Sequence, residues 1–446
     1  MSAQPPIEVP PWQAPEPPAK PGWMKWLLGG LIGCGVIALV AAGVAGYFAY
    51  QAVTKLAGSV TGVQQPAPAT PAAQASFVES VHFAAPNDVA ALASGDMTQS
   101  GVADIVALAG PDVVVVDQAG KRIGAFATGL PPSPSMGRMP GFATAAYAPR
   151  LRTGTLHKQP ALVVASTLGD AVVGYARDGR ELLRNAVSGT RVTGLEVADV
   201  NGDGKSEILV GRDSQLGLTC LNGAGATEWQ FGVTTQPSIV VVADGTGDGK
   251  PEVYVGESMT GATPITVLDN HGKQIGRWPG GLGELALAAA DLDNDQKAEF
   301  LAIALDLRPQ AGRSPASSLG SAFNVSLVGL SSAGKEGWRT SLGGGMASMF
   351  GVALGAGDFD GDGKGEWIVN GPDGTLRVYN RDGVELCRQA MGQYIAALTV
   401  TPPGKKGGRA RAWVAMGRRI VGLDWQKWMT GPAPSPGARK AKSSGG

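Results

Sequence analysis

The chain has 446 residues, of which 67 are glycine and only 6% are aromatic. This glycine content is about twice the average usage, which favours many short strands joined by tight turns over a helical enzyme. The 37 basic and 37 acidic residues balance, so no nucleic-acid partner is expected, and three cysteines are too few for a disulfide framework.

The N-terminal part of the chain is predicted to form a tail, a membrane span and a linker. Residues 1–24 are rich in proline and predict a disordered tail. Residues 25–52 contain an uncharged run of 25 residues, from Trp26 to Tyr50, with aromatic residues at both ends. Such a run is long enough to cross a bilayer core of roughly 30 Å as a transmembrane helix. Residues 53–75 predict a flexible linker.

The membrane attachment has one alternative. The segment Leu31-Ile32-Gly33-Cys34 resembles a bacterial lipobox, in which the cysteine is lipidated after signal cleavage. The apolar run continues for sixteen residues past Cys34, which favours a single-pass transmembrane helix. Flanking lysines indicate the orientation only faintly. Because the metal sites described below favour a Ca²⁺-rich exterior, we predict a cell-membrane protein whose C-terminal part is extracytoplasmic.

Internal repeats follow the linker. Four segments share an acidic, glycine-rich loop that leads into an apolar strand: VADVNGDGKSEILVG (197–211), VADGTGDGKPEVYVG (242–256), AADLDNDQKAEFLAI (289–303) and AGDFDGDGKGEWIVN (356–370). Each is preceded by one strand and followed by two more around a turn that contains glycine. Three further units have the strands without the acidic loop, which gives seven units of about 49 residues over residues 87–430.

Four strands per unit at this period predict the blades of a β-propeller. We therefore predict an all-β fold, a seven-bladed β-propeller of four-stranded blades over residues 76–430, preceded by the single transmembrane helix. The last unit has no clear fourth strand, whereas residues 76–84 have strand character. This N-terminal strand is expected to complete blade seven and so remove an exposed sheet edge. Residues 431–446 predict a disordered tail.

The acidic loops predict Ca²⁺ sites. Oxygen-bearing side chains at positions 1, 3, 5 and 9 of each loop converge, glycine at position 6 permits the turn, and the backbone carbonyl at position 7 completes the ring of hard ligands. The predicted ligands are Asp199, Asn201, Asp203, Lys205 and Glu207 in blade three; Asp244, Thr246, Asp248, Lys250 and Glu252 in blade four; Asp291, Asp293, Asp295, Lys297 and Glu299 in blade five; and Asp358, Asp360, Asp362, Lys364 and Glu366 in blade six. Position 12, where an EF-hand needs glutamate, is apolar in every loop, which excludes that motif.

Turn formation alone is the alternative explanation, because aspartate and glycine both favour turns. The four loops, however, hold 14 of the chain's 37 acidic residues, and such crowded carboxylates repel one another unless a cation neutralises them. Two loops depart from the ideal pattern. Blade four has Thr246 at a ligand position, and blade five has Gln296 where glycine is expected.

The D-x-[DN]-x-D-G-x-x-E loop followed by an apolar strand resembles the FG-GAP (VCBS-type) repeats of integrin-like propellers. The resemblance covers roughly residues 76–430 and is strong in blades three, four and six, imperfect in five and faint in one, two and seven. It implies a rigid extracytoplasmic platform in which Ca²⁺ fastens the loop between the first two strands of a blade. It implies little about a ligand, since propellers serve both binding and catalysis.

The sequence carries no recognisable catalytic constellation, because its three histidines lie in separate units and nucleophile and phosphate-binding motifs do not occur. The leading hypothesis is a non-enzymatic, membrane-anchored recognition or scaffold module of the adhesion type. The alternative is an enzyme that acts on polysaccharide with its site in the central funnel. The recurring tryptophans are expected to pack between blades, and Cys387, which takes the place of Trp229, is expected to be an inert core thiol.

Basic residues stand where blades two and seven would carry acidic loops. They are Arg150, Arg152, His157 and Lys158 in blade two, and Lys405, Lys406, Arg409 and Arg411 in blade seven. Ring closure places blades seven, one and two side by side, so these residues are predicted to form a basic arc. The arc would meet an anionic protein or glycan ligand or lipid headgroups. The alternative is a solvated substitute for a lost metal site.

Overall fold

In the computed structural model the described residues are 75–130, 150–165, 169–213, 216–232, 236–257, 264–278, 284–306, 324–344, 353–371, 373–404 and 408–427. Within these ranges the regular secondary structure consists of strands, and no helix is long and apolar enough to cross a membrane. The two predicted tails, the predicted span 25–52 and the linker before residue 75 lie outside these ranges, so they remain predictions.

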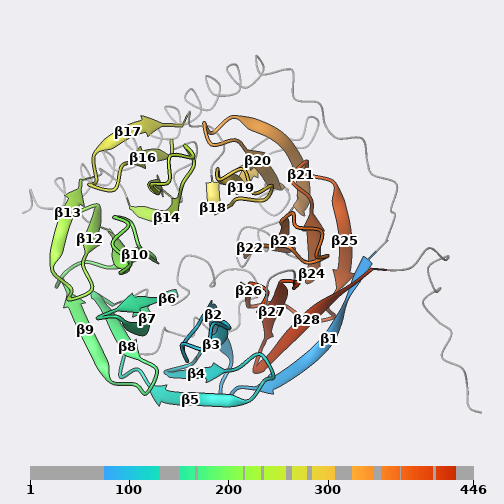
Figure 1. Cartoon of the computed structure of the whole chain (residues 1–446), viewed down its shortest axis with the longest axis horizontal. Coiled ribbons are helices and arrows are strands. Elements are labelled where there is room, and N and C mark those ends of the chain that lie inside the picture. The colour runs from blue at the N-terminus through green and yellow to red at the C-terminus, as the bar shows by residue number, and fades with distance from the viewer. Residues whose placement is uncertain are drawn as a thin grey trace, which may run out of the picture. The chain divides into compact units, whose positions relative to one another are not determined.

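The described strands form seven four-stranded antiparallel sheets arranged as the blades of a ring (Figure 1). The first three blades consist of β2 (Val89–Gly95), β3 (Asp104–Ala109), β4 (Asp112–Val116) and β5 (Arg122–Ala127); β6 (Arg150–Leu156), β7 (Gln159–Ala165), β8 (Ala171–Ala176) and β9 (Glu181–Ala186); and β10 (Val192–Ala198), β11 (Glu207–Arg212), β12 (Leu218–Leu221) and β13 (Thr227–Phe231). Blades four to six consist of β14 (Pro237–Ala243), β15 (Glu252–Glu257), β16 (Thr266–Leu268) and β17 (Gln274–Arg277); β18 (Glu284–Ala290), β19 (Glu299–Asp306), β20 (Asn324–Leu330) and β21 (Glu336–Gly344); and β22 (Leu354–Gly357), β23 (Glu366–Asn370), β24 (Thr375–Tyr379) and β25 (Glu385–Ala390). The predicted all-β, seven-bladed propeller is therefore confirmed.

Blade seven closes the ring with strands from both ends of the propeller. It consists of β26 (Ala397–Thr401), β27 (Arg411–Met416), β28 (Arg419–Lys427) and β1 (Ala75–Ala84), in the spatial order β1-β28-β27-β26. The outer pair runs antiparallel from Ala75 opposite Lys427 to Ala84 opposite Arg419. The predicted closure of blade seven by the N-terminal strand is thus confirmed, with the strand beginning one residue earlier than expected.

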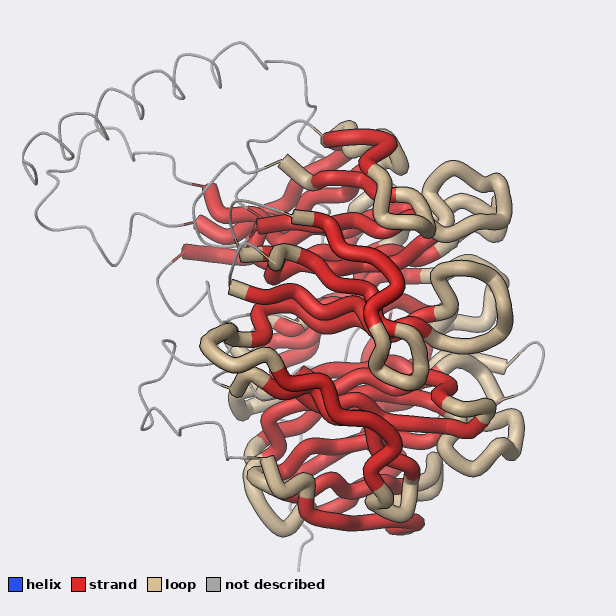
Figure 2. The backbone as a smooth tube through the Cα atoms, turned by 90° about the vertical axis from the view of Figure 1, so that its left-hand side faces the viewer, coloured by secondary structure: helices blue, strands red, loops and turns tan. Residues whose placement is uncertain are grey.

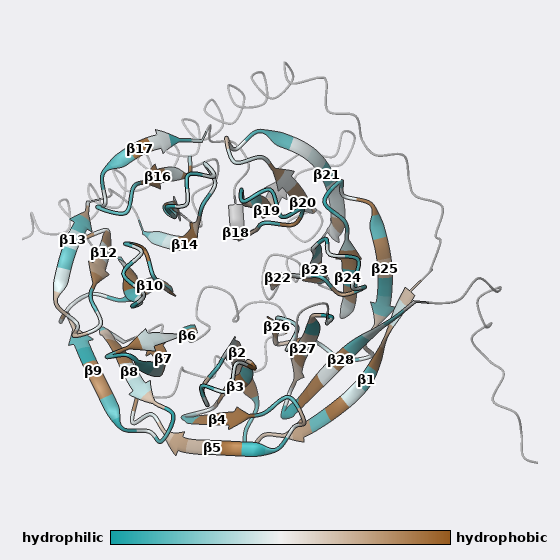
Figure 3. Cartoon of the chain, viewed as in Figure 1, coloured by the Kyte–Doolittle hydropathy of each residue, from teal (hydrophilic) through white to brown (hydrophobic). Residues whose placement is uncertain are grey.

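Burial of the strands depends on their place in the blade. The second strands, such as β3 and β23, are buried along their whole length because both of their faces pack against neighbouring blades. The sequence of these strands is therefore a continuous apolar run, without the alternation of apolar and polar residues found in strands with one exposed face. The outermost strands, such as β13, alternate between exposed and half-buried residues, and Figure 3 shows hydrophilic segments along β13 and β17. The apolar core therefore lies between the blades, in seven clusters of buried side chains.

Neighbouring blades interlock through the hairpin between the third and fourth strands. The glycine of each hairpin lies against a bulky side chain on the outer strand of the preceding blade, as Gly272 does against Trp229 and Gly383 against Trp338. Each of these two indoles also donates a hydrogen bond to a carbonyl oxygen of the same hairpin, at 3.1 and 2.8 Å. The predicted packing of the tryptophans between blades is therefore confirmed.

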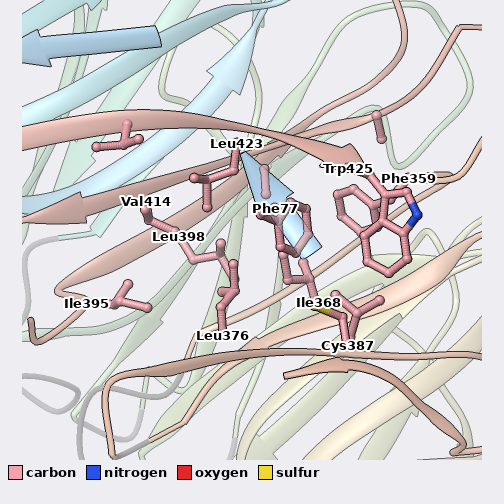
Figure 4. Packing of buried hydrophobic residues seen from close by; sticks show 14 of the residues in the cluster. Phe77, Phe359, Ile368, Leu376, Cys387, Ile395, Leu398, Val414, Leu423 and Trp425 are labelled. Atoms are coloured by element: carbon pink, nitrogen blue, oxygen red, sulfur yellow. The ribbon is translucent and has the colours of Figure 1, made fainter. Parts of the chain in front are cut away.

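The closing strand is anchored in the apolar cluster between blades six and seven (Figure 4). Phe77 of β1 is 4% exposed and packs edge-on against Phe359 and Trp425, with ring centroids 5.9 and 5.3 Å apart. Cys387 belongs to the same cluster and is 3% exposed. Its burial raises the pKa of the thiol to about 12. A thiol in this state is a weak nucleophile, which agrees with the predicted inert core thiol.

Candidate metal loops

The predicted ligands lie in the connections between the first and second strands of blades three to six, for example between β10 and β11. Because all four connections join equivalent strands, they lie on the same face of the ring. Figure 2 shows the loops gathered on the two faces, with the strands between them. The fold therefore repeats one loop geometry around a single face of the propeller.

The aspartate at position 1 organises each loop by accepting backbone hydrogen bonds on both carboxylate oxygens. Asp199 accepts from the N–H of Gly202 at 2.7 Å and from the N–H of Gly204 at 2.8 Å. Asp244 and Asp358 accept equivalent pairs of bonds in their own loops. Asp291 accepts from the N–H groups of Asp295 and Gln296, at positions 5 and 6, at 3.1 and 2.9 Å. The backbone at positions 4 and 6 adopts positive φ, which explains the repeated glycines.

The glutamate at position 9 begins the second strand and points back into the loop. In every one of the four loops one of its oxygens accepts the N–H of position 2 at 2.9 Å. Glu207, Glu252 and Glu366 are at most 5% exposed. Burial, together with nearby aspartates, raises the pKa of Glu366 to about 7, and burial also raises the pKa of Glu207 and Glu299. A cation bound at the loop would oppose this effect, because a nearby positive charge favours the ionised form of a carboxyl group.

The residue at position 7 donates its backbone N–H within the loop. In each loop the amide of the lysine at this position donates to the carboxylate at position 5, at 2.8 or 2.9 Å: Lys205 to Asp203, Lys250 to Asp248, Lys297 to Asp295 and Lys364 to Asp362. This bond turns the chain after position 5, so that the position 5 carboxylate stays at the loop.

Carboxylates converge closely in three of the loops. Their oxygens lie within 4.8 Å of one another in the groups Asp244, Asp248 and Glu252 of blade four; Asp291, Asp293 and Asp295 of blade five; and Asp358, Asp360 and Glu366 of blade six. Oxygens on opposite sides of a Ca²⁺ ion are about 5 Å apart, since each Ca–O bond is about 2.3–2.6 Å long. Both the spacing and the hard donor atoms therefore fit Ca²⁺.

In blade three the described carboxylates Asp199, Asp203 and Glu207 do not form such a converging group, and an amide stands at position 3. The Nδ2 of Asn201 donates to Glu207 at 3.2 Å, and Thr246 makes the equivalent contact with Glu252 through its hydroxyl at 3.0 Å in blade four. Asp203 pairs with Lys205 of its own loop at 2.6 Å, but both side chains are about half exposed. Such an exposed pair contributes little energy and leaves Asp203 able to turn toward a cation.

Blade one carries a loop of the same shape, although its sequence was interpreted as a unit without the acidic loop. Asp96 accepts the N–H groups of Ser100 and Gly101 at 2.9 and 2.7 Å, as the position 1 aspartates do elsewhere. Thr98 stands at position 3 and donates to Asp104, the position 9 residue, at 3.2 Å. The spacing of these residues could have revealed the loop, but the hydroxyls at positions 3 and 5 give it fewer anionic ligands.

An arginine from blade six lies beside the acidic loop of blade five, a contact that was not predicted from the sequence. The guanidinium of Arg381, from the hairpin between β24 and β25, bonds to Asp293 and lies 3.1 Å from Glu299. At the equivalent hairpin position of the two preceding blades the sequence has Asn270 and Ser332. The residues at positions 4 and 6 also differ, since Asn294 and Gln296 hold φ of 59° and 70° where glycines stand in the other loops.

The basic residues of blade two lie differently from what the sequence predicted. Arg150 and Arg152 belong to the inner strand β6 instead of a loop, and Arg152 pairs with Glu196 of blade three at 3.0 Å. The connection from β6 to β7 is a turn formed by His157 and Lys158, both at positive φ. The prediction of a basic loop here was wrong because an uninterrupted antiparallel pairing from Arg150 to Gln159 leaves room only for this turn.

In blade seven the described basic residues line a cavity of about 270 Å³ next to blade one. Arg409 is exposed in the connection before β27, and Arg411 begins that strand. Arg411 is ion-paired with Asp424 at 2.6 Å and donates to the carbonyl oxygen of Gln118 at 2.9 Å. Lys405 and Lys406 lie outside the described residues. Among the described residues of the predicted arc, the exposed ones on the loop face are therefore His157, Lys158 and Arg409.

Comparison with known proteins connects part of this ring to one family. The profile of the lambda-carrageenase β-propeller domain matches residues 162–277, from β7 to the last strand of blade four. Lambda-carrageenase from Pseudoalteromonas carrageenovora is 32% identical over 95 residues, and one from Pseudoalteromonas sp. matches to the same extent. The match covers 21% of this chain and 10% of each of those proteins, so the chain spans about a tenth of their length.

Solved structures resemble the whole ring at low sequence identity. BBS1N in complex with ARL6DN matches with a TM-score of 0.54 and 12% identity, over 78% of this chain and 96% of that one. Raptor from Chaetomium thermophilum matches with a TM-score of 0.51 and 12% identity, over 79% of this chain and 29% of that one. At such identities the likeness concerns the fold alone. The chain therefore contains a seven-bladed β-propeller domain with local similarity to the propeller of lambda-carrageenase.

Proposed function

We propose that this protein is a recognition or scaffold propeller whose blades are fastened by Ca²⁺ in the acidic loops, as in the FG-GAP repeats that the sequence resembles. The observation that carries the proposal is the buried glutamate at position 9. Glu366 is 4% exposed, stands with Asp358 and Asp360 in one group of converging carboxylates, and has a strongly raised pKa. A divalent cation at this point removes the repulsion among these groups and ties the first two strands of the blade together.

The loops of blades four and six support this proposal most directly, and the blade-three loop shares their position 1 geometry. Each has an aspartate at position 1 that is held by backbone N–H groups, so its remaining lone pairs are already oriented before an ion arrives. Preorganised ligands lower the cost of binding, and extracellular modules of this kind commonly bind Ca²⁺ at roughly 10⁻⁴–10⁻³ M. Ligation at several blades would make the ring a stiff platform for a partner.

Calorimetric titration of the full-length chain with Ca²⁺ after chelation tests this proposal, together with melting curves in both states. We expect saturable heat and a higher melting temperature with Ca²⁺, because an ion that binds only the folded state stabilises it. D358N should remove one site, since it weakens a position 1 ligand. D96N is the matched control, because the blade-one loop has the same backbone geometry but hydroxyls at positions 3 and 5. A titration with neither heat nor stabilisation would reduce the acidic loops to turns.

The location of the propeller is part of the proposal and comes from the sequence. Residues 25–52 would anchor the chain in the cell membrane as a single span, with the propeller on the extracytoplasmic side, where Ca²⁺ is abundant. Extraction of isolated membranes at alkaline pH tests the anchor, since a spanning protein stays in the pellet. Digestion of intact cells with an added protease tests the side. A chain that is released by alkali or protected in intact cells would contradict the respective part.

The partner that we propose for the platform is anionic and meets the loop face at Lys158 and Arg409, which are exposed there. Positive side chains on one face attract an acidic glycan, lipid headgroup or acidic protein surface and speed its approach. The variant with both residues changed to glutamate should lose association with a soluble polyanion such as dextran sulfate. Unchanged association would remove these residues from the proposal.

A second candidate function is action on a polysaccharide, with the active site in the central funnel. It is favoured by the similarity of blades two to four to lambda-carrageenase. Incubation of the full-length chain with lambda-carrageenan and measurement of new reducing ends tests it, with the heat-denatured chain as control. Release of reducing ends would favour the enzyme, whereas retention of the chain on immobilised polysaccharide without release would favour recognition.

A further inference from the structure

The blade-five loop already has a cation of the chain's own beside it. The guanidinium of Arg381 bonds to Asp293, the position 3 residue, and lies 3.1 Å from Glu299, the position 9 residue. The side chains of Asp293 and Glu299 are 26% and 15% exposed, so both are more sheltered than an ordinary surface ion pair. A guanidinium in contact with two carboxylates supplies charge and hydrogen bonds at once.

The placement of Arg381 follows from the way that every blade locks onto its neighbour. Its carbonyl oxygen accepts the indole N–H of Trp338, and the carbonyl oxygen of Asn270 accepts the indole N–H of Trp229 in the same way. The hairpin backbone is therefore fixed against the preceding blade at this residue. From this fixed position the Arg381 side chain reaches the acidic loop of blade five, whereas at the equivalent position blade five has the short, neutral Ser332.

The contact changes the ligand set of the loop. In blades four and six the converging carboxylates include the glutamate at position 9, Glu252 or Glu366. In blade five the group consists of Asp291, Asp293 and Asp295, while Glu299 lies beside Arg381. Two of the predicted ligands, at positions 3 and 9, are thus engaged by the guanidinium.

The same loop is held to blade six by further bonds. The Nδ2 of Asn294 donates to the carbonyl oxygen of Gly363 at 2.6 Å, and the N–H of Gly365 donates to the carbonyl oxygen of Leu292 at 2.7 Å. Asn294 stands at position 4, where the other three loops have glycine. The backbone bond has counterparts in blades four and six, where Ala298 donates to Asp244 and Ala410 donates to Asp358, so the Asn294 bond is the contact particular to blade five.

We propose that Arg381 replaces Ca²⁺ in the blade-five loop, so that this loop is neutralised by a guanidinium while those of blades three, four and six take the metal. The proposal rests on the Ca²⁺ binding put forward above and revises it for one blade. A Ca²⁺ ion in this loop would have to displace Arg381 from Asp293 and Glu299, and the guanidinium remains charged at every accessible pH. Among the four acidic loops, the blade-five loop is consequently the one that chelation does not loosen.

Native mass spectrometry and equilibrium dialysis of the full-length chain with Ca²⁺ test this proposal. R381N gives the blade-six hairpin the residue that the blade-four hairpin has at the same position, Asn270. This variant should bind one more Ca²⁺ ion per chain than the wild type, because the carboxylates of Asp293 and Glu299 become available as ligands. The buried Oδ1 of Asp293 has no hydrogen-bond partner among the described residues. In the variant, no guanidinium competes with Ca²⁺ for this carboxylate. R388Q is the matched control, since Arg388 lies in the following strand, pairs with Glu385 of its own blade, and should leave the number of bound ions unchanged.

Two further variants keep the proposal testable if R381N folds poorly. D293N and D360N change the position 3 ligand in blades five and six, respectively. We expect D293N to bind as many Ca²⁺ ions as the wild type and D360N to bind one fewer. Loss of an ion in D293N, or no gain in an R381N chain that folds, would overturn the role of Arg381 and leave Ca²⁺ binding intact. A wild-type chain that binds no Ca²⁺ would overturn the proposed function itself.

Discussion

Phe77→Ala tests whether the closing strand stabilises the whole ring. Phe77 is 4% exposed and contacts the rings of Phe359 and Trp425, so its removal leaves a cavity in the cluster between blades six and seven. Truncation of a buried phenylalanine to alanine costs about 3–5 kcal/mol. The backbone N–H of residue 77 and its carbonyl oxygen keep their bonds to Gln389, so the expected loss comes from the side chain alone.

The expected change in melting temperature follows from the size of the propeller. An unfolding entropy of about 2.1 cal/mol/K per residue over about 350 residues amounts to about 0.7 kcal/mol/K. The loss of about 3–5 kcal/mol at Phe77 therefore predicts a melting temperature lower by about 4–7 °C.

Calorimetry of the full-length chain with excess Ca²⁺ measures this change. Val78→Ala is the matched control, because Val78 is the next residue of the same strand and is 46% exposed. Its substitution should alter the free energy of unfolding by no more than about 0.5 kcal/mol. If the two variants melted within a degree of each other, the cluster around Phe77 would not hold the ring closed, and the reasoning would fail.

Two further predictions concern a buried carboxyl group and an interblade contact. Burial raises the pKa of Glu366 from 4.5 to about 7. Between these two pH values the Ca²⁺-free folded chain holds a proton that the unfolded chain has released. The contribution of Glu366 to the free energy of unfolding is therefore full below pH 4.5 and is lost as the pH rises through about 7. In chelator, the wild type should lose about 3 kcal/mol in urea unfolding between about pH 4.5 and pH 8, whereas E366Q should lose much less; parallel pH curves would contradict this. G383A should destabilise the chain by about 1–3 kcal/mol more than G392A, because an added Cβ at Gly383 would lie 2.4 Å from the Trp338 ring, whereas Gly392 has a similar positive φ and nothing within 4 Å. Equal melting temperatures for these two variants would show that the hairpin does not pack tightly on the indole.

The blade count and the closure of the ring could be predicted from the sequence, because each depends on a local repeat. Acidic loops at a constant spacing from apolar strands mark the blades even where single residues have drifted. The missing fourth strand of the last unit required a strand from elsewhere, and the segment before the first unit was the available one. The number of blades and the closure of the ring could therefore be predicted only by comparing the repeats with one another.

Blade two shows where that approach fails. Its basic residues occupy positions where other blades have loop acids, so alignment of the repeats placed Arg150 and Arg152 in a loop. In the structure β6 and β7 pair without interruption up to Gln159, and the two arginines belong to a strand. Loop length is set by backbone pairing, which the identity of the aligned residues does not report.

The contact of Arg381 could not be predicted for a different reason. Arg381 and Asp293 are 88 residues apart and belong to different blades, and a hairpin arginine is an ordinary surface residue in the sequence. Only the rotation from one blade to the next brings the hairpin over the preceding loop. Cys387 is explained by the same rule: it replaces tryptophan on the outer strand of blade six, where blade seven offers the rings of Phe77 and Trp425 instead of a hairpin glycine.

The pairing of Ala75 with Lys427 gives the propeller a mechanical property. The described chain enters the ring and leaves it at the same end of one antiparallel strand pair. A force that pulls these two points apart acts perpendicular to the two strands, and it breaks the hydrogen bonds between them one after another. Such a geometry yields at lower force than a geometry in which all the bonds are sheared together. Tension applied through both ends would therefore peel β1 away from Ala75 onward and uncover the edge of β28, while the other six blades keep their pairing.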